Sequence, residues 1–333
     1  MRLIGFVSFS LIALASLAFF CDSARSEARE ELGTFNFVLE NDLFADLDRH
    51  YTNGIRFSWL SSENQVPAFI LNGANYIPIF PQETDIRVEY ALGQSMFTPR
   101  DITIHNPPPE DRPYAGYLYG SVGLISDNGK RLDKLQLSLG LVGPESFAEQ
   151  AQEFVHDIQD ADDPHGWDTQ LPNEPTFQFN YRRSWWAAAS TEFWGLKTDL
   201  TPHIGAALGS VYVYADTGFV IRLGQNLPRD YGPPRIMPSL PGSGFFIPQQ
   251  GLGWYVFGGL SGRGVAHNIF LDGTVFNACR SVEKEPLVGE AQTGWALTYN
   301  NFRFAYTHVF RTQEFETQDE ADFFGALSIS YRF

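Results

Sequence analysis

Cysteine is nearly absent from this sequence, which holds two in 333 residues, Cys21 and Cys279. Cys21 falls in a segment that we expect to be removed, so the mature chain would keep one cysteine and could form no internal disulfide. A small secreted scaffold stabilised by disulfides is therefore excluded. Basic residues are also scarce, with 23 Lys and Arg against 39 Asp and Glu and a net charge of -16. Because phosphate binding needs a basic footprint, we expect no nucleic-acid partner.

Long apolar runs are missing as well, except at the N-terminus. Arg2 precedes a largely apolar run from Leu3 to Phe20, and small and charged residues follow it as far as Ala28. This layout predicts a secretory signal peptide over residues 1–28 that is cleaved, and it favours cleavage over a retained membrane helix. An exported chain without disulfides suits a bacterial envelope protein. We expect residues 29–333 to form a single domain, since the sequence contains no evident boundary or internal repeat.

Aromatic residues and glycine are abundant, and apolar residues alternate with polar ones. Phe35, Phe37 and Leu39 alternate with Asn36 and Glu40 near the start of the mature chain. The same period of two recurs over residues 55–59, 87–93, 134–141 and 177–185. This period indicates β-strands with one apolar face. Aromatics at 15% of residues, together with 30 glycines, favour a closed antiparallel barrel with aromatic girdles over a helical domain.

The C-terminus decides between a membrane barrel and a soluble all-β domain, which would show the same alternation. The alternating apolar positions at this end are Phe323, Gly325, Leu327, Ile329, Tyr331 and Phe333. A strand that runs to an aromatic last residue resembles the terminal assembly signal of bacterial outer-membrane barrels. In water its edge would be a liability, whereas in a closed barrel it pairs with the first strand. We therefore predict an all-β fold, a transmembrane antiparallel β-barrel of about twelve strands.

The position of each strand can be read from the alternation. We expect strands near residues 34–40, 52–60, 86–95, 115–125, 132–142, 175–186, 199–213, 217–224, 252–262, 291–299, 302–311 and 323–333. Ile269, Phe270 and Leu271 could add a short strand to the connection after the ninth.

The order of the strands predicts which loops share a rim. Both termini of such barrels face the periplasm, so every odd strand is followed by an extracellular loop. The long extracellular loops would be residues 41–51, 96–114, 143–174, 263–290 and 312–322. The acidic connection 143–174, which contains His156 and His165, then shares a rim with Asn41, Asp42 and Arg112. Loops of this kind often carry function.

The first two strands bring polar residues to one height at this rim. Asn41 and Asp42 close the first strand, and Thr52 opens the second. Carboxylate and amide oxygens are ligands that calcium prefers. The alternative for these three residues is a polar hairpin without a ligand.

A candidate base lies in the connection 143–174. Gln152 and His156 are four residues apart and would share a face of a helical turn. A neutral histidine held by a neighbour can take a proton from water. Asp162 and Asp163 follow closely enough to bind a cation or the imidazole. The alternative for His156 is a solvated surface histidine, and we treat His165 as structural or solvated.

An ordered set of motifs resembles the outer-membrane lipid A 3-O-deacylase family over essentially the whole mature chain. The set is Glu40-Asn41-Asp42, Tyr51-Thr52-Asn53-Gly54, Asp111-Arg112-Pro113-Tyr114-Ala115-Gly116, Gln152-x-x-x-His156 and Gly166-Trp167-Asp168-x-Gln170-Leu171-x-Asn173-Glu174. The resemblance implies a twelve-stranded barrel in the Gram-negative outer membrane, with lipopolysaccharide as its partner and a monomeric state expected. The implied activity is calcium-dependent removal of the 3'-acyloxyacyl chain from lipid A.

The resemblance also implies roles for individual residues. His156 would be the catalytic base with Gln152 as its helical neighbour, and Asn41, Asp42 and Thr52 would be active-site residues. Asp42 and Asp162 would hold the Ca²⁺, although Asp162 stands where the family has a glutamate. The family's adjacent Lys-Arg pair has no counterpart, because Ile104-His105 occupies that region, and Arg100 or Arg112 could bind the phosphates instead.

The expected mechanism is direct attack of water on the ester, since the chain has no Gly-x-Ser-x-Gly elbow. The acyl chains would lie along the apolar outer wall, so the site should open sideways to the lipid. Two alternatives stay open. An outer-membrane phospholipase would need a Ser-His pair at one height, and a porin or adhesin would have a wide lumen and dispensable outer loops.

Overall fold

The computed structural model describes residues 33–42, 50–74, 76–77, 84–159, 163–238, 244–277 and 279–333. The predicted signal peptide and Asp162 lie outside these ranges. Among the described residues, no helix combines the length and the apolar character needed to cross a membrane.

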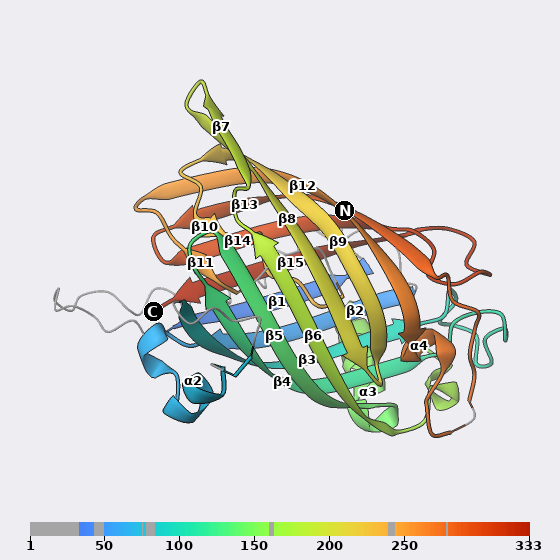
Figure 1. The fold of residues 1–333 in the computed structure, drawn as a ribbon. Helices are drawn as coiled ribbons and strands as arrows, with labels where there is room; N and C mark the ends of the chain where they lie inside the picture. Colours follow the sequence, from blue (N-terminus) through green and yellow to red (C-terminus); the bar gives the residue numbers. More distant parts are fainter. Residues whose placement is uncertain are drawn as a thin grey trace. The chain divides into compact units, whose positions relative to one another are not determined.

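Twelve antiparallel strands close into a barrel (Figure 1). They are β1 (Thr34–Asn41), β2 (His50–Leu60), β3 (Asp85–Thr98), β4 (Ala115–Asp127), β5 (Arg131–Val142), β6 (Glu174–Trp185), β8 (Leu196–Gly209), β9 (Tyr212–Gln225), β12 (Leu252–Asn268), β13 (Leu287–Tyr299), β14 (Phe302–Arg311) and β15 (Asp322–Arg332). Pairing of β1 with β15 and of β6 with β8 completes the ring. The predicted barrel is therefore confirmed, including the pairing of the last strand with the first.

The wall places its polar face inside and its apolar face outside. Arg56 and Glu89 are 5% and 1% exposed and form an ion pair in the interior, with 2.7 Å between Nη2 and Oε2. Phe57 and Leu92, one residue after Arg56 and three residues after Glu89, are 46% and 57% exposed on the outer face. A soluble β-domain would show the opposite distribution, whereas a lipid-facing barrel requires this one.

The connections after the first, third, fifth, seventh, ninth and eleventh strands of the wall, counted in chain order, share one rim, as predicted. Figure 1 shows α3 (Ala148–Gln159) and α4 (Ile269–Asp272) at this end, which we call the α3 rim. The connection between β5 and β6 also contains two 3-10 turns, η3 (Pro144–Ser146) and η4 (Trp167–Thr169). The opposite end, the C-terminal rim, carries α2 (Ala68–Ala74) and the C-terminus. The short turn η2 (Glu63–Gln65) precedes α2, and β7 (Ala189–Phe193) pairs with β8 in a hairpin that projects beyond this rim.

Three local predictions were wrong. The loop predicted over residues 263–290 is shorter, because β12 continues to Asn268 and β13 begins at Leu287. The seventh and eighth strands turn at Ser210 and Val211 rather than at residues 214–216, because the alternation of β9 continues without a break from Tyr212 and Val211 is buried in the lumen. The segment that begins at Ile269 forms the helical turn α4 instead of a strand. The side chain of Asn268 accepts a hydrogen bond from the backbone N–H of Phe270 at 3.1 Å and so caps this turn.

The connection between β9 and β12 folds back into the lumen from the C-terminal rim and contains β10 (Arg229–Asp230) and β11 (Phe246–Ile247). Asp230 is completely buried and bonds to Arg222 of β9 and to Nη1 of Arg303 of β14, the latter at 2.9 Å. Arg235 bonds through Nε to Glu40 at 2.9 Å. These ion pairs fasten the described parts of the connection to opposite sides of the wall, so we call it the plug.

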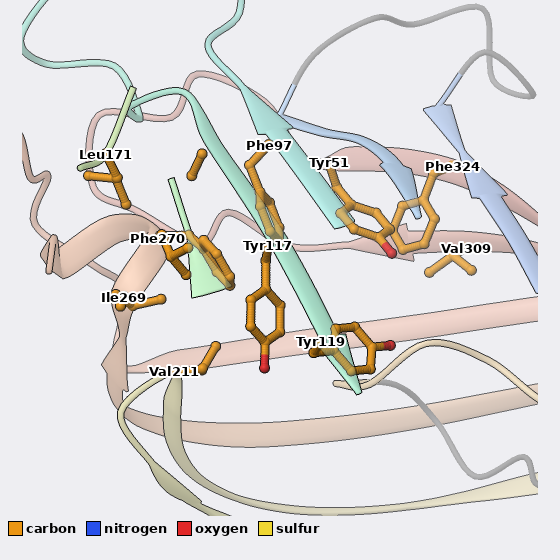
Figure 2. Packing of buried hydrophobic residues seen from close by; sticks show 12 residues of the cluster. Tyr51, Phe97, Tyr117, Tyr119, Leu171, Val211, Ile269, Phe270, Val309 and Phe324 are labelled. Carbon is orange, nitrogen blue, oxygen red and sulfur yellow. The ribbon is translucent and has the colours of Figure 1, made fainter. Parts of the chain in front are cut away.

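Aromatic residues pack in the lumen between the plug and the α3 rim. Figure 2 shows the rings of Tyr51, Phe97 and Phe324 gathered between the strands. The ring of Phe97 stacks on that of Phe270 from α4, with 4.1 Å between centroids, and Tyr51 meets Phe324 edge-on at 5.0 Å. The plug and this cluster occupy the interior where a porin would have its channel.

Replacing Asp230 with Asn should destabilise the barrel, because it removes the carboxylate shared by two buried guanidinium groups. Breaking a buried ion pair from one side costs about 3–5 kcal/mol. Urea unfolding of the purified protein in detergent, followed by the shift of folded to unfolded bands in gel electrophoresis, measures the loss. Asp85→Asn, at an exposed position on β3, is the matched control and should have little effect. Equal midpoints for the two variants would contradict the plug's role.

Candidate active site

A small pocket lies between α3 and the ends of β1, β2 and β3. Its lining residues are Asn41, Thr52, Asn53, Ile55, Met96, Ala151, Gln152, Val155 and His156. Four of the residues predicted from the sequence therefore meet in one place, although they come from three separate segments of the chain.

The pocket lies on the outer side of the wall. Successive residues of a strand face opposite sides, and Glu40, which precedes Asn41, bonds to the plug inside the lumen. Phe97 likewise points into the lumen, while its neighbours Met96 and Thr98 face the other way. The side chains that line the pocket are thus separated from the lumen by the thickness of one strand.

A β-bulge at the start of β2 shapes the pocket floor. His50 pairs with Thr98 and Asn53 pairs with Met96, so one extra residue is inserted between them in β2. Thr52 and Asn53, neighbours in sequence, can then both line the pocket. The hydroxyl oxygens of Thr52 and Thr98 are 2.7 Å apart, and both residues are buried. Nothing in the sequence alone indicated the bulge or the part played by Thr98.

Helix α3 is held close to the outer face of the wall by contacts at its first turn. A Cβ atom on Gly116 of β4 would lie 2.0 Å from Ser146 Oγ and 2.4 Å from Ala148 Cβ, so only glycine allows this approach. The amide Nε2 of Gln94 on β3 donates to the backbone oxygen of Ser146 at 2.7 Å. These contacts fix where α3 begins and therefore where its side chains reach the pocket.

Gln152 and His156 share the buried face of α3, as their spacing predicts. They are 2% and 4% exposed, and Gln152 Nε2 lies 3.5 Å from His156 Nε2. The indole Nε1–H of Trp167, from η4, donates to Gln152 Oε1 at 2.8 Å. Trp167 belongs to a motif noted in the sequence, but nothing there indicated that it reaches Gln152.

Of the two acids expected to bind a metal, Asp42 and Asp162, the structure describes Asp42. Asp42 follows Asn41 directly and is 1% exposed. Asp42 is not among the residues that line the pocket, whereas Asn41 and Thr52 are. Carboxylate, amide and hydroxyl oxygens of these three residue types suit a hard cation such as calcium. Asp162, the second acid implied for this ion, lies outside the described residues. Among the residues that are described, no group of three or more His, Cys, Asp or Glu could hold a metal by itself.

The two arginines considered for phosphate binding do not line the pocket. Arg112 is completely buried, with its guanidinium 4.8 Å above the ring of Phe97 and 3.8 Å from Glu314 Oε2. Burial lowers the pKa of Arg112, and the neighbouring carboxylates of Glu314 and Asp322 oppose that shift. Arg100 is half exposed and pairs with Asp319. The structure thus places Arg112 on the lumen side with Phe97 and Arg100 in an outer loop.

Comparison with known proteins decides the family. A family described as "Outer membrane protein LpxR" matches residues 9–333. The chain belongs to this family. The solved structure of LpxR from Salmonella typhimurium has a TM-score of 0.73 at 18% identity and covers 90% of this chain and 100% of that chain, which establishes the common fold. The β domain of the Bordetella autotransporter BrkA has a TM-score of 0.44 at 8% identity and covers 90% and 98% of the two chains. No curated protein sequence matches the chain.

Membership of the LpxR family, which is described as an outer membrane protein family, indicates that the outer side of the wall contacts lipid. For an outer membrane barrel, exposed apolar residues such as Phe57 and Leu92 face lipid. The pocket lies on that same side, at the α3 rim.

Gly116→Leu should push α3 away from the wall, since the added side chain would overlap Ser146 and Ala148. Overpacking of this kind costs about 1–3 kcal/mol, so cleavage by a glutamate-specific protease after Glu149 in α3 should become at least about fivefold faster. Gly120→Leu is the control on the same face of β4, because a Cβ there meets nothing nearer than 4.0 Å. Cleavage at the same rate in both variants, with the barrels folded, would argue against the close contact.

Proposed function

We propose that this protein is a calcium-dependent hydrolase of the Gram-negative outer membrane that removes the 3'-acyloxyacyl chain from lipid A and acts as a monomer. The observation that carries the proposal is the meeting of Asn41, Thr52, Gln152 and His156 in one pocket on the lipid side of the wall. A pocket on this side of the wall suits a substrate that stays in the membrane.

The position of the pocket suits a lipid with a polar headgroup. It lies at the rim, and the exposed side chains of Phe57 and Leu92 continue from its strands along the outer wall. Acyl chains can lie along these residues while the ester stays at the level of His156.

His156 is the proposed general base. It takes a proton from a water molecule, whose oxygen attacks the ester carbonyl to give a tetrahedral intermediate. The intermediate collapses when the bond to the sugar oxygen breaks, and the imidazolium returns its proton to that oxygen. The products are a free fatty acid and a sugar hydroxyl. Asn41 and Thr52 orient the water and the ester by hydrogen bonds.

Asp42 is the proposed calcium ligand, with Asn41 beside it and Asp162 as a further carboxylate. A bound calcium ion would supply positive charge that stabilises the negative oxygen of the intermediate. Support comes from the amide of Asn41 in the pocket and from the buried carboxylate of Asp42, which directly follows Asn41 in the chain.

Neither alternative agrees as well with these residues. A phospholipase with a serine nucleophile would need a serine beside His156, and none of the described residues that line the pocket is a serine. Ser146 is buried against Gly116 at the start of the connection. A porin would need an open lumen, whereas residues of the plug and of the aromatic cluster lie in this one.

His156→Ala should abolish deacylation in cells that express the folded barrel. Loss of a general base lowers the rate by about 100-fold to 10,000-fold. Mass spectrometry of extracted lipid A measures the result, and lipid A should keep its 3'-acyloxyacyl chain. His165→Ala, an exposed histidine of the same connection, is the matched control and should leave the activity unchanged. Normal deacylation by His156→Ala would rule out this base.

Chelation of calcium should stop hydrolysis of purified lipid A in detergent without unfolding the barrel. Added Ca²⁺ should restore the activity, whereas Mg²⁺ should restore little, because it demands a tighter octahedral site. Asp42→Asn should raise the calcium concentration needed for half-maximal rate by at least about tenfold. Full activity in the presence of chelator would exclude the role of the metal.

A further inference from the structure

We infer that Trp167 is a positioning residue, whose indole N–H orients the amide of Gln152 so that Nε2 of His156 stays unprotonated. This inference rests on the proposed function, because it assigns the nitrogen of His156 that acts as the base. The orientation itself can be tested without any substrate.

The indole of Trp167 fixes which end of the Gln152 amide faces the imidazole. An indole N–H can only donate, so the amide oxygen must face Trp167 Nε1, and this bond measures 2.8 Å. The amide nitrogen then faces His156 Nε2 at 3.5 Å. An amide orientation is normally assigned from its hydrogen bonds, and here the donor-only partner leaves one choice.

A donor that faces Nε2 favours the imidazole tautomer with its proton on Nδ1. Nε2 then keeps its lone pair, which a general base needs. The distance of 3.5 Å is at the long end for a hydrogen bond. The contact therefore sets the tautomer without occupying Nε2 so strongly that a substrate water is kept away. With the amide reversed, its oxygen would favour the proton on Nε2 and remove the base.

Burial and packing fix the position of the Trp167 side chain. It is 1% exposed, and its ring lies 4.9 Å from that of Tyr114. The hydroxyl of Tyr114 donates to the backbone oxygen of Ile102 at 3.1 Å, and the backbone N–H of Leu171 donates to the oxygen of Tyr114 at 2.9 Å. A Cβ on Gly166 would lie 2.4 Å from Tyr114 Cε2, so the ring needs glycine before the tryptophan. Two outer loops thus fix the indole.

Two substitutions separate this role from simple packing. Gln152→Glu keeps an oxygen for Trp167 but presents a second oxygen to His156, so the proton should move to Nε2. Trp167→Phe keeps an aromatic ring and removes the N–H, so both amide orientations and both tautomers should be populated. Each substitution has a matched control at an exposed position. Gln150→Glu, on α3, is the control for Gln152→Glu, and Trp194→Phe, at the 96% exposed tip of the β7–β8 hairpin, is the control for Trp167→Phe.

Nitrogen-15 spectra of histidine-labelled protein in detergent micelles report the tautomer, because protonated and unprotonated ring nitrogens differ widely in chemical shift. The chain has seven histidines, and His156→Ala identifies the signals of His156. At alkaline pH the parent protein and both controls should show the proton on Nδ1. Gln152→Glu should show it on Nε2, and Trp167→Phe should show a mixture.

The rate of lipid A hydrolysis should depend on the fraction of protein in which Nε2 of His156 is unprotonated. We expect kcat/KM to fall at least about 100-fold in Gln152→Glu, mostly in kcat, because the substrate contacts stay in place. In Trp167→Phe it should fall about twofold to tenfold, in proportion to the fraction of the Nδ1-protonated tautomer that is lost. A proton on Nε2 in the parent protein, or a tautomer unchanged in both variants, would overturn the inference. If the tautomers behave as expected but the parent protein leaves lipid A intact, the proposed function fails and the role of Trp167 in orienting the imidazole stands.

Discussion

Closure of the strand ladder is the constraint on which the rest of the structure depends. A membrane offers no water to unpaired backbone groups, so the sheet must have no edge. Pairing of β1 with β15 and of β6 with β8 removes both edges. Closure then creates an interior, and the plug enters it and bonds to Arg222, Arg303 and Glu40 of the wall. The pocket beside α3 lies on the other face of the same wall.

The same strands carry two unrelated environments one residue apart. Glu40 contacts the plug, and Asn41 lines the pocket. Tyr51 packs in the lumen against Phe324, and Thr52 lines the pocket. Each pair assigns one neighbour to a charged and aromatic interior and the other to the lipid side. The roles of these residues are therefore set by strand register before any catalytic chemistry is considered.

Much of the fold could be predicted from the sequence, because strand positions depend on a local period of two. The alternation of Phe35, Phe37 and Leu39 and its repeats predicted twelve strands, and strand order predicted that the segments carrying Asn41 and His156 share a rim. The missed features depend on contacts between distant segments. Residues of the plug have no period, and the bond from Trp167 to Gln152 exists only because two outer loops pack together.

Register also explains why the bulge in β2 matters. In a regular strand a slip of one residue would exchange every lumen side chain with a lipid-facing one. The ion pair of Arg56 with Glu89 would then lie in lipid, which is far more costly than any gain at the rim. The register below the rim is thus fixed by charge, and only an inserted residue above it can turn both Thr52 and Asn53 toward α3. The bulge lets the pocket depart from a pattern that the rest of the wall must keep.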